Sequence, residues 1–200
     1  MAGSGFSSTS AIYTQATLAL HSFGHEESVM SYDKILNELG AESISFETKR
    51  LCNSLQDDIE ISENLKRLLD EFKTAIVFSN GARFKIPKKM PVGDKDGFVF
   101  LDVIYGMAPD SNSIHYKNEM YSNQIRSDFY TFGESGGGDQ FCINKNTEEV
   151  YYWYHEAKVD ASSLFLIAPS FNSFFEQLTP CNYEVNSKDD DEIISAEFDF

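Results

Sequence analysis

The sequence has few cysteines, and they are poorly placed for cross-linking or for holding a metal. Among 200 residues only Cys52, Cys142 and Cys181 are cysteine, and no two of them form a Cys-x-x-Cys pair. An odd number of widely spaced cysteines argues against a disulfide framework and against a structural zinc site. No Asn-x-Ser/Thr sequon occurs either. We therefore expect a protein of a reducing cytoplasm.

Long apolar runs are also missing. No stretch approaches the roughly 18 to 20 apolar residues that a membrane-spanning helix needs. No Lys or Arg precedes the first weakly apolar stretch, as a secretory signal would require. The sequence therefore favours a cytoplasmic protein without membrane contact. Hydrophobic residues still make up 42% of the chain, including 17 Phe and 10 Tyr. That content is enough for a folded core and excludes a wholly disordered chain.

Positive charge is scarce, above all in the second half of the chain. The sequence holds 16 Lys and Arg against 32 Asp and Glu, a formal net charge of −16. Residues 1–95 carry a net charge of −2, whereas residues 96–200 carry −14. A surface of that sign repels phosphate backbones, so nucleic acid is excluded as a partner of the second half. It would attract a basic protein, although solubility alone also accounts for an acidic composition.

Apolar periodicity predicts the elements of secondary structure. Helices are expected at residues 29–39, 63–72 and 171–178, and a weak helix within 110–125. Gly40 is placed to end the first helix, and Ser62 and Ser170 are placed as N-caps. Strands are expected at 75–78, 84–87, 98–105, 129–132, 140–143, 150–154 and 164–167. The segment 84–87 would pair back on 75–78 across the Asn80-Gly81 turn, and residues 94–97 and 144–149 are expected to form turns.

The order of these elements predicts an α+β fold. Helices come first, strands follow and a helix closes the series, so a single domain with a mostly antiparallel mixed sheet of about six strands flanked by helices is expected. Residues 1–27 are expected to form a mobile N-terminal extension, residues 28–178 the domain, and residues 179–200 an acidic tail. The end of that tail alternates in polarity, which fits an edge strand and fits disorder equally well.

A glycine-rich segment, residues 133–139, offers the one enzyme-like motif. Gly133-Glu134-Ser135-Gly136-Gly137 matches Gly-x-Ser-x-Gly, the elbow of serine hydrolases. That elbow needs a helix after the serine, but the residues that follow are typical of a strand. A phosphate loop would need Lys and Ser/Thr after the last glycine, and Asp139 and Gln140 stand there instead. A glycine turn with positive φ angles is the simpler interpretation. The four histidines lack metal-site spacing, so neither a metal nor a cofactor is expected.

Three ordered motifs in residues 129–178 resemble the SUKH superfamily. Residues 129–143 read Phe-Tyr-Thr-Phe-Gly-Glu-Ser-Gly-Gly-Gly-Asp-Gln-Phe-Cys-Ile, similar to that family's aromatic-Gly dipeptide, Gly-Gly-Asp turn and following strand. Residues 150–156 read Val-Tyr-Tyr-Trp-Tyr-His-Glu, similar to its Val-Tyr-x-Trp-x-His-Glu strand. Residues 168–174 contain Ala-x-Ser-Phe-x-x-Phe, similar to its strand-to-helix passage. Upstream, the resemblance rests on the helix at 63–72 and the Asn-Gly turn.

The resemblance implies an α+β domain without enzymatic activity. Bacterial members are mainly immunity proteins that bind and neutralise toxins, often nucleases, of polymorphic or contact-dependent systems, and fungal members are regulatory scaffolds in cell-wall signalling. We expect an immunity protein bound to a basic cognate toxin, with a regulatory interaction module as the alternative and a hydrolase using Ser135 as a third, disfavoured one. The expected partner-binding residues surround the turn after Phe132: Glu134, Asp139, Glu148, Glu149 and Glu156. A second set is assigned to the fold: Phe132, Gly133, Gly137, Gly138, Trp153, Ser170, Phe171 and Phe174.

Overall fold

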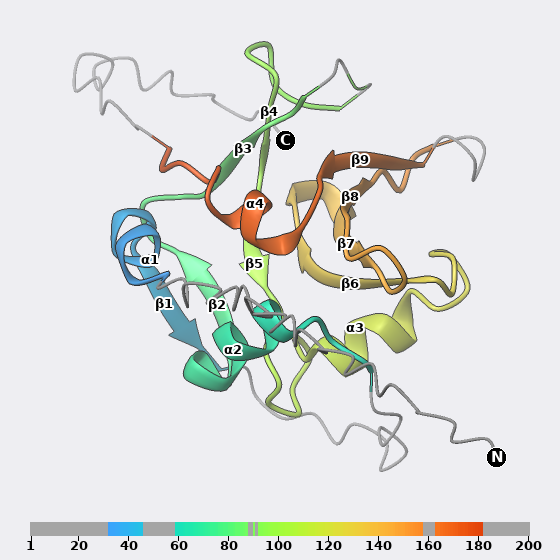
Figure 1. Ribbon diagram of the computed structural model, residues 1–200, viewed down its shortest axis with the longest axis horizontal. Helices are drawn as coiled ribbons and strands as arrows, with labels where there is room; N and C mark the ends of the chain where they lie inside the picture. Colours follow the sequence, from blue (N-terminus) through green and yellow to red (C-terminus); the bar gives the residue numbers. More distant parts are fainter. Residues whose placement is uncertain (1–31, 46–58, 88–89, 91, 158–162, 182–200) are drawn as a thin grey trace, which may run out of the picture. The chain divides into compact units, whose positions relative to one another are not determined.

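The computed structural model describes residues 32–45, 59–87, 90, 92–157 and 163–181 of the chain (Figure 1). The expected N-terminal extension at 1–27 lies outside these residues. So do residues 29–31 of the first expected helix and residues 182–200 of the expected tail. The described residues thus cover most of the domain that was expected at 28–178.

Four helices and nine strands make up the described part of the chain. The helices are α1 (Asp33–Leu39), α2 (Glu63–Phe72), α3 (Ile114–Met120) and α4 (Phe171–Phe175). The strands are β1 (Ala41–Ile44), β2 (Ala75–Phe78), β3 (Arg83–Lys85), β4 (Phe98–Phe100), β5 (Val103–Ile104), β6 (Phe129–Glu134), β7 (Gln140–Asn144), β8 (Val150–Trp153) and β9 (Leu164–Ala168). A short 3₁₀ turn, η1 (Gly136–Gly138), joins β6 to β7.

Seven strands form one sheet in the order β1-β2-β5-β6-β7-β8-β9, and β3 pairs with β4 separately. All these strand pairs are antiparallel, so the predicted α+β class is confirmed. The sheet has one strand more than the roughly six expected, because β1 was not predicted. In β1 two exposed residues, Glu42 and Ser43, are adjacent, so the strand has no apolar alternation by which to recognise it.

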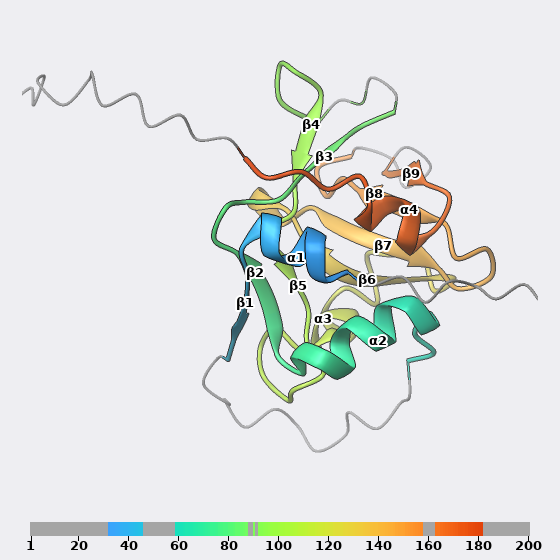
Figure 2. The ribbon, with the colours of Figure 1, turned by 60° about the vertical axis from the view of Figure 1, so that its left-hand side comes forward.

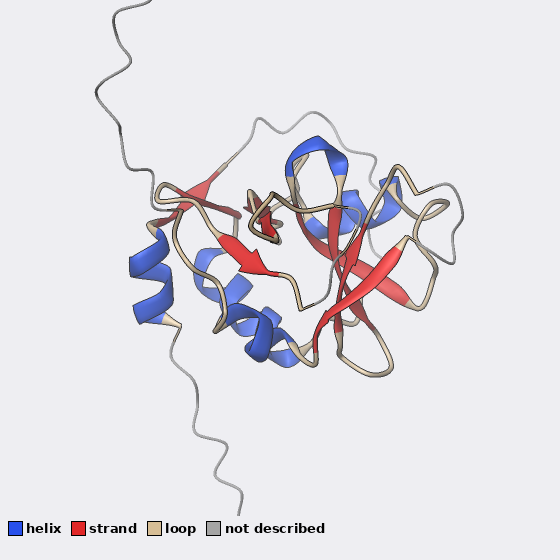
Figure 3. Cartoon of the chain, turned by 90° about the horizontal axis from the view of Figure 1, so that it is seen from above, coloured by secondary structure: helices blue, strands red, loops and turns tan. Residues whose placement is uncertain are grey.

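Helices α1, α2 and α4 lie together on one face of the sheet (Figure 2). Phe174 of α4 packs against Phe132 of β6 and Phe141 of β7, with ring centroids 5.7 and 5.3 Å apart. Tyr32, the residue before α1, packs against Phe175 at 4.6 Å. Seen from above, the helices flank the strands (Figure 3). Burial of these aromatic rings is the main stabilising contribution on this face.

A second cluster covers the opposite face of β6, β7 and β8. Ile125, Phe129, Cys142 and Trp153 are buried there, and Tyr121, Tyr151 and Leu164 pack against them. Strand β8 therefore has apolar neighbours on both faces. Helix α3 is tied to this part of the sheet by Asn118, whose side chain accepts from the Thr131 N–H and donates to the Thr131 carbonyl.

The predicted caps are correct in position, but α4 ends at Phe175 and not at residue 178 as expected, because the chain continues in a tighter turn. Gly40 adopts a left-handed conformation, with φ of +64°, and ends α1. The Ser170 hydroxyl accepts from the Ser173 N–H at 3.2 Å, so the predicted cap of α4 is confirmed. Ser62 occupies the N-cap position of α2, as predicted, although its side chain makes no capping hydrogen bond. Its backbone N–H instead donates to the Tyr130 hydroxyl at 2.9 Å, so a tertiary contact fixes the start of α2.

Two strand predictions in the middle of the chain are wrong. The expected pairing of 84–87 with 75–78 does not form, because β3 pairs with β4 instead. The expected strand at 98–105 is divided between β4 and β5, which belong to different sheets. The Leu101 N–H donates to the Ala82 carbonyl, whereas the Asp102 N–H donates to the Glu134 carbonyl. The chain therefore leaves the β3–β4 ribbon between these two residues and enters the main sheet.

Candidate functional site

The expected glycine turn joins β6 to β7. The Ser135 N–H donates to the Asp139 carbonyl at 2.9 Å and closes the turn. The φ angles of Gly137 (+85°) and Gly138 (+102°) are positive, a region in which residues with a Cβ are strained. The backbone of the turn, and not phosphate binding, accounts for these two glycines.

Gly137→Val should lower the free energy of unfolding by about 1–3 kcal/mol, because a β-branched residue is strained at positive φ. A Cβ at this position would meet nothing within 4 Å, so the loss reports backbone strain alone. Ser135→Ala, in the same turn, leaves the backbone unstrained and removes only the hydrogen bond with Tyr152, so it should cost about 1 kcal/mol. Chemical denaturation of both variants checks the prediction. A Gly137→Val variant as stable as the unmodified chain would show that the turn tolerates other conformations.

Asp139 ends the turn with a buried carboxylate whose oxygens are already bonded. Its Oδ2 accepts from the Tyr152 hydroxyl at 2.8 Å, and its Oδ1 accepts from the His155 N–H at 3.0 Å. The His155 Nδ1 lies 2.7 Å from the same Oδ1. Burial raises the pKa of the Tyr152 hydroxyl, and the Asp139 charge raises it further, while a hydrogen bond with Ser135 lowers it. Asp139 thus fixes the turn to the end of β8.

An open groove of about 440 Å³ lies between this turn and the β3–β4 ribbon. Its walls are formed by Val92, Gly93, Asp94, Phe98, Val99, Phe100, Ser135, Gly136, Gly137, Asp139, Tyr152, Tyr154, His155 and Glu156. We name this cavity the Gly-Gly-Asp groove. Three of the lining residues are acidic and none is Lys or Arg. The groove therefore combines aromatic walls with a negative potential, a combination that suits a cationic side chain.

Two cations of β3, the strand that pairs with β4, contact an aromatic ring that lines the groove. The Arg83 guanidinium and the Lys85 ammonium lie 4.4 and 4.6 Å from the centre of the Phe98 ring. Lys85 also donates to the Asp96 carbonyl. Both side chains are held by the ribbon that carries Phe98, and they do not line the groove.

Glu134 lies at the end of β6, where an internal cation balances its charge. Its carboxylate is 2.7 Å from the Lys117 ammonium, and the Lys117 side chain is 12% exposed. The Tyr105 hydroxyl also lies 2.9 Å from Glu134 Oε2. Burial raises the pKa of Tyr105, and the neighbouring Glu134 charge raises it further. Glu134 is thus engaged inside the domain, and its expected contact with a partner stays a prediction.

Asp102→Asn should stabilise the protein at neutral pH. Partial burial raises the pKa of Asp102, and the Glu134 charge raises it further, although a hydrogen bond from the Gly136 N–H lowers it. A raised pKa means that the folded state favours the protonated carboxyl, so this residue costs stability as the pH rises through that pKa. Because solvent still reaches much of the Asp102 side chain and screens its charge, the gain should be below about 1 kcal/mol. Denaturation curves should show the gain at pH 7 and its loss below about pH 4, where the carboxyl is protonated in both states.

The remaining expected partner-binding acids occupy two separate places. Glu148 and Glu149 lie in the β7–β8 hairpin, at the opposite end of these strands from the glycine turn. Glu156 follows β8 and lines the Gly-Gly-Asp groove, and its side chain is 67% exposed. Of the five expected acids, the structure therefore brings only Asp139 and Glu156 together in this groove.

The surroundings of Ser135 do not form a hydrolase elbow. The residues after it make a single 3₁₀ turn with positive φ at Gly137, and Asp139 then returns to extended backbone. A helix, which the elbow requires, is not formed there. The Asp139 carboxylate is hydrogen-bonded to Tyr152 and His155, and not to Ser135. The arrangement supports the glycine-turn interpretation of this motif over the catalytic one.

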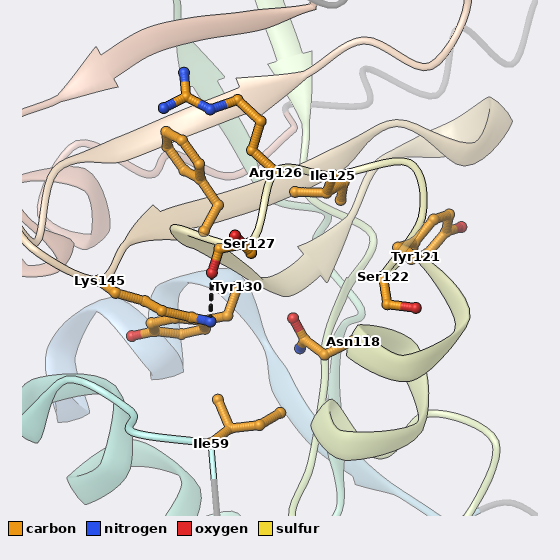
Figure 4. Close-up of a pocket in the computed structure, with 10 residues that line it drawn as sticks. Ile59, Asn118, Tyr121, Ser122, Ile125, Arg126, Ser127, Tyr130 and Lys145 are labelled. Atoms are coloured by element: carbon orange, nitrogen blue, oxygen red, sulfur yellow. Dashed lines mark hydrogen bonds between the residues drawn. The ribbon is translucent and has the colours of Figure 1, made fainter. Parts of the chain in front are cut away.

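A second, smaller pocket opens beside α3 (Figure 4). It is lined by Ile59, Asn118, Tyr121, Ser122, Ile125, Arg126, Ser127, Phe129, Tyr130 and Lys145. Its two cations are engaged, because Lys145 donates to the Ser127 carbonyl at 2.7 Å and Arg126 pairs with Asp128 at 2.6 Å. Both cations thus stabilise the loop at residues 126–128, which forms one wall of the pocket. For this reason we favour the Gly-Gly-Asp groove as the functional site.

Sequence reasoning missed the ribbon side of the groove. Asp94, Phe98 and Phe100 line it, but the latter two were assigned to one long strand in the sheet. The Asp94 carboxylate accepts from the N–H groups of Asp96 and Phe98, and these bonds confirm the expected turn at 94–97. That turn was the available signal, since it lies directly before β4 in the connection between β3 and β4.

Two other kinds of site, a metal site and a membrane-spanning helix, have no candidate among the described residues. In residues 32–45, 59–87, 90, 92–157 and 163–181, no group of three or more His, Cys, Asp and Glu side chains is placed to hold a metal ion. Within the same ranges, no helix has the length and apolar character needed to cross a membrane.

Comparison with known proteins agrees with the three motifs. Residues 53–177 match the model of the SMI1/KNR4 family (SUKH-1), a span that contains α2, the β3–β4 ribbon, the glycine turn and α4. The chain is also 30% identical over 132 residues to the SPbeta prophage-derived uncharacterized protein YokK of Bacillus subtilis (strain 168), which covers 66% of this chain and 68% of that protein. No solved structure matches the chain significantly. The chain belongs to the SMI1/KNR4 (SUKH-1) family.

Proposed function

We propose that this chain is an immunity protein that binds a basic protein toxin and blocks it. The observation that carries the proposal is the Gly-Gly-Asp groove, which has aromatic and acidic walls and no Lys or Arg among its lining residues. The family consists mainly of immunity and regulatory proteins, which supports binding over catalysis. This function needs no cofactor, and we propose that the protein acts in the cytoplasm.

The groove offers two kinds of contact to a cationic side chain of the toxin. The Glu156 carboxylate is well exposed at the rim, and it accepts from the Tyr154 hydroxyl at 2.8 Å, which holds it beside that ring. An arginine of the partner could meet this carboxylate while its stem and guanidinium lie against Tyr154 or Phe100. Such a contact is worth roughly 0.5–2 kcal/mol, depending on how far it is desolvated.

A nuclease is the toxin class that this surface suits best. Nucleases hold phosphates with Lys and Arg, so their substrate-binding surface is basic. An acidic protein that covers this surface excludes the nucleic acid sterically. The net charge of −14 in residues 96–200 would also speed its association with such a toxin.

The alternative is a regulatory interaction module that has no toxin partner. The prophage origin stated in the name of the Bacillus subtilis relative favours the immunity role, because a mobile bacterial element is a setting in which toxins and their inhibitors travel together.

Co-expression tests the proposal. The protein encoded by the gene beside that of this chain is expressed alone and with the chain in a bacterial host. Arrest of growth by the neighbouring product alone, and restored growth with the chain, is the expected result. A harmless neighbouring product would contradict the immunity role, as would an arrest that persists although the chain is present and folded.

A further inference from the structure

Strand β9 ends the seven-stranded sheet, and its outer edge has no strand partner in the described part of the chain. The Tyr154 N–H donates to the Ser163 carbonyl at 2.8 Å, so these two residues form a hydrogen-bonded pair. In an antiparallel pair, such positions alternate with positions whose backbone groups point away from the partner strand. Leu164 and Leu166 occupy these alternate positions. Their N–H and C=O groups therefore point outward.

The side chains of β9 do not protect this edge. The strand reads Leu-Phe-Leu-Ile-Ala and carries neither a charge nor a proline, the features with which natural sheets usually block an exposed edge. Leu166 is 47% exposed, and Leu164 and Phe165 are half-buried. Outward backbone groups beside an apolar surface are the features by which a sheet edge accepts an additional strand.

Carboxylates lie beyond both ends of β8, the strand that neighbours β9 in the sheet. Glu149 accepts from the Tyr151 hydroxyl at 3.1 Å, and Tyr151 is the cross-strand neighbour of Leu166. At the other end, Glu156 accepts from the Tyr154 hydroxyl, just beyond the last pair of β8 and β9. A Lys or Arg side chain near either end of a strand laid along β9 could therefore pair with one of these carboxylates by reaching across β9.

These charges decide which occupant the edge suits. Arg126, the cation whose charge lowers the pKa of Tyr151, is already paired with Asp128, so it is not free to neutralise Glu149. A second copy of the chain would bring another net charge of −16, which disfavours pairing of two such edges. A basic extended segment meets attraction instead.

We infer that the outer edge of β9 accepts an extended segment of the toxin as an additional strand. This inference rests on the proposed function. This segment carries Lys or Arg near its ends, opposite Glu149 and Glu156, and its apolar side chains contact Leu166. The backbone pairing would supply affinity, and the two carboxylates would select a basic segment over an acidic one.

Amide hydrogen exchange of the full chain, followed by NMR, tests this inference with a short synthetic peptide that alternates Lys and Val. At ten times its Kd, the peptide should slow exchange of the Leu164 and Leu166 amides about tenfold. A peptide that alternates Glu and Val should leave both rates unchanged. The inference is overturned if the basic peptide slows neither amide, or if it protects β1, the other edge of the sheet, equally well.

A matched pair of variants adds a control. Leu166→Lys places a like charge on the edge and should abolish the protection by the basic peptide. Met120→Lys makes the same kind of change on α3, where Met120 is 44% exposed, and should preserve it. Thermal melts confirm that both variants are folded. Protection that grows with protein concentration in the absence of peptide would identify a second copy as the occupant and overturn the inference.

The co-expression test separates this inference from the function on which it rests. If Leu166→Lys still restores growth as well as the unmodified chain does, β9 is not the docking edge, and the immunity role stands. If the unmodified chain does not restore growth, the immunity role is wrong whatever the peptide does.

Discussion

Phe174→Ala should lower the free energy of unfolding by about 3–5 kcal/mol, because it removes an aromatic ring from a site that cannot close around the cavity. Phe174 is fully buried, and its ring packs against those of Phe84, Phe132, Phe141 and Phe171. These partners come from β3, β6, β7 and α4, so one side chain joins the ribbon to the main sheet. A loss of this size is a large fraction of the roughly 5–15 kcal/mol that stabilises a typical domain.

Chemical denaturation measures this loss, and Met120→Ala serves as the control. Met120 is 44% exposed on α3, so its truncation should cost less than about 1 kcal/mol. Equal losses in the two variants would mean that Phe174 does not occupy the centre of the core.

Glu156→Lys should slow association with the toxin about tenfold at low salt, because a charge is reversed at the rim of the Gly-Gly-Asp groove. Glu156 is exposed, and its carboxylate accepts from the Tyr154 hydroxyl and lies 4.0 Å from the His155 ring nitrogen. Contacts at so exposed a site stabilise the fold little, so the melting temperature should hardly change. Stopped-flow kinetics measures the rate. The difference between the two proteins should shrink as salt is raised, because exposed charges are screened beyond about 8 Å at physiological ionic strength.

Glu176→Lys is the matched control for this variant. Glu176 is exposed at the end of α4 and does not line the groove, yet its replacement changes the net charge by the same amount. It should slow association much less than Glu156→Lys does. Equal slowing in both variants would show that the effect comes from the overall charge and that the toxin does not bind at the groove.

The parts of the fold that local sequence determines were predictable. Strands β6, β7 and β8 follow one another through short turns, so apolar runs and the glycine segment were enough to place them. The division of residues 98–105 was not predictable in this way. Ala82 and Glu134, which bond to the neighbouring residues Leu101 and Asp102, lie far apart in the sequence, and no local pattern reports such a contact.

The candidate site was predictable only in part, because a sequence shows a charge but not its burial. Asp139 and Glu156 were both expected to contact a partner. The structure places the Asp139 carboxylate in internal bonds to Tyr152 and His155, whereas the Glu156 carboxylate is exposed at the rim. Glu134 forms an ion pair with Lys117. The two residues lie far apart in the sequence, so no local pattern indicates this contact.

Titration of the toxin's activity with the purified chain tests the central claim most directly. The toxin is the product of the neighbouring gene, and its nuclease activity is measured on nucleic acid at a toxin concentration far above the Kd. An inhibitor that acts by occlusion should lower the activity in proportion to the amount added and abolish it when the two proteins are equimolar. Activity that persists beyond equimolar chain would contradict the account, and so would activity that is lost with a trace of it.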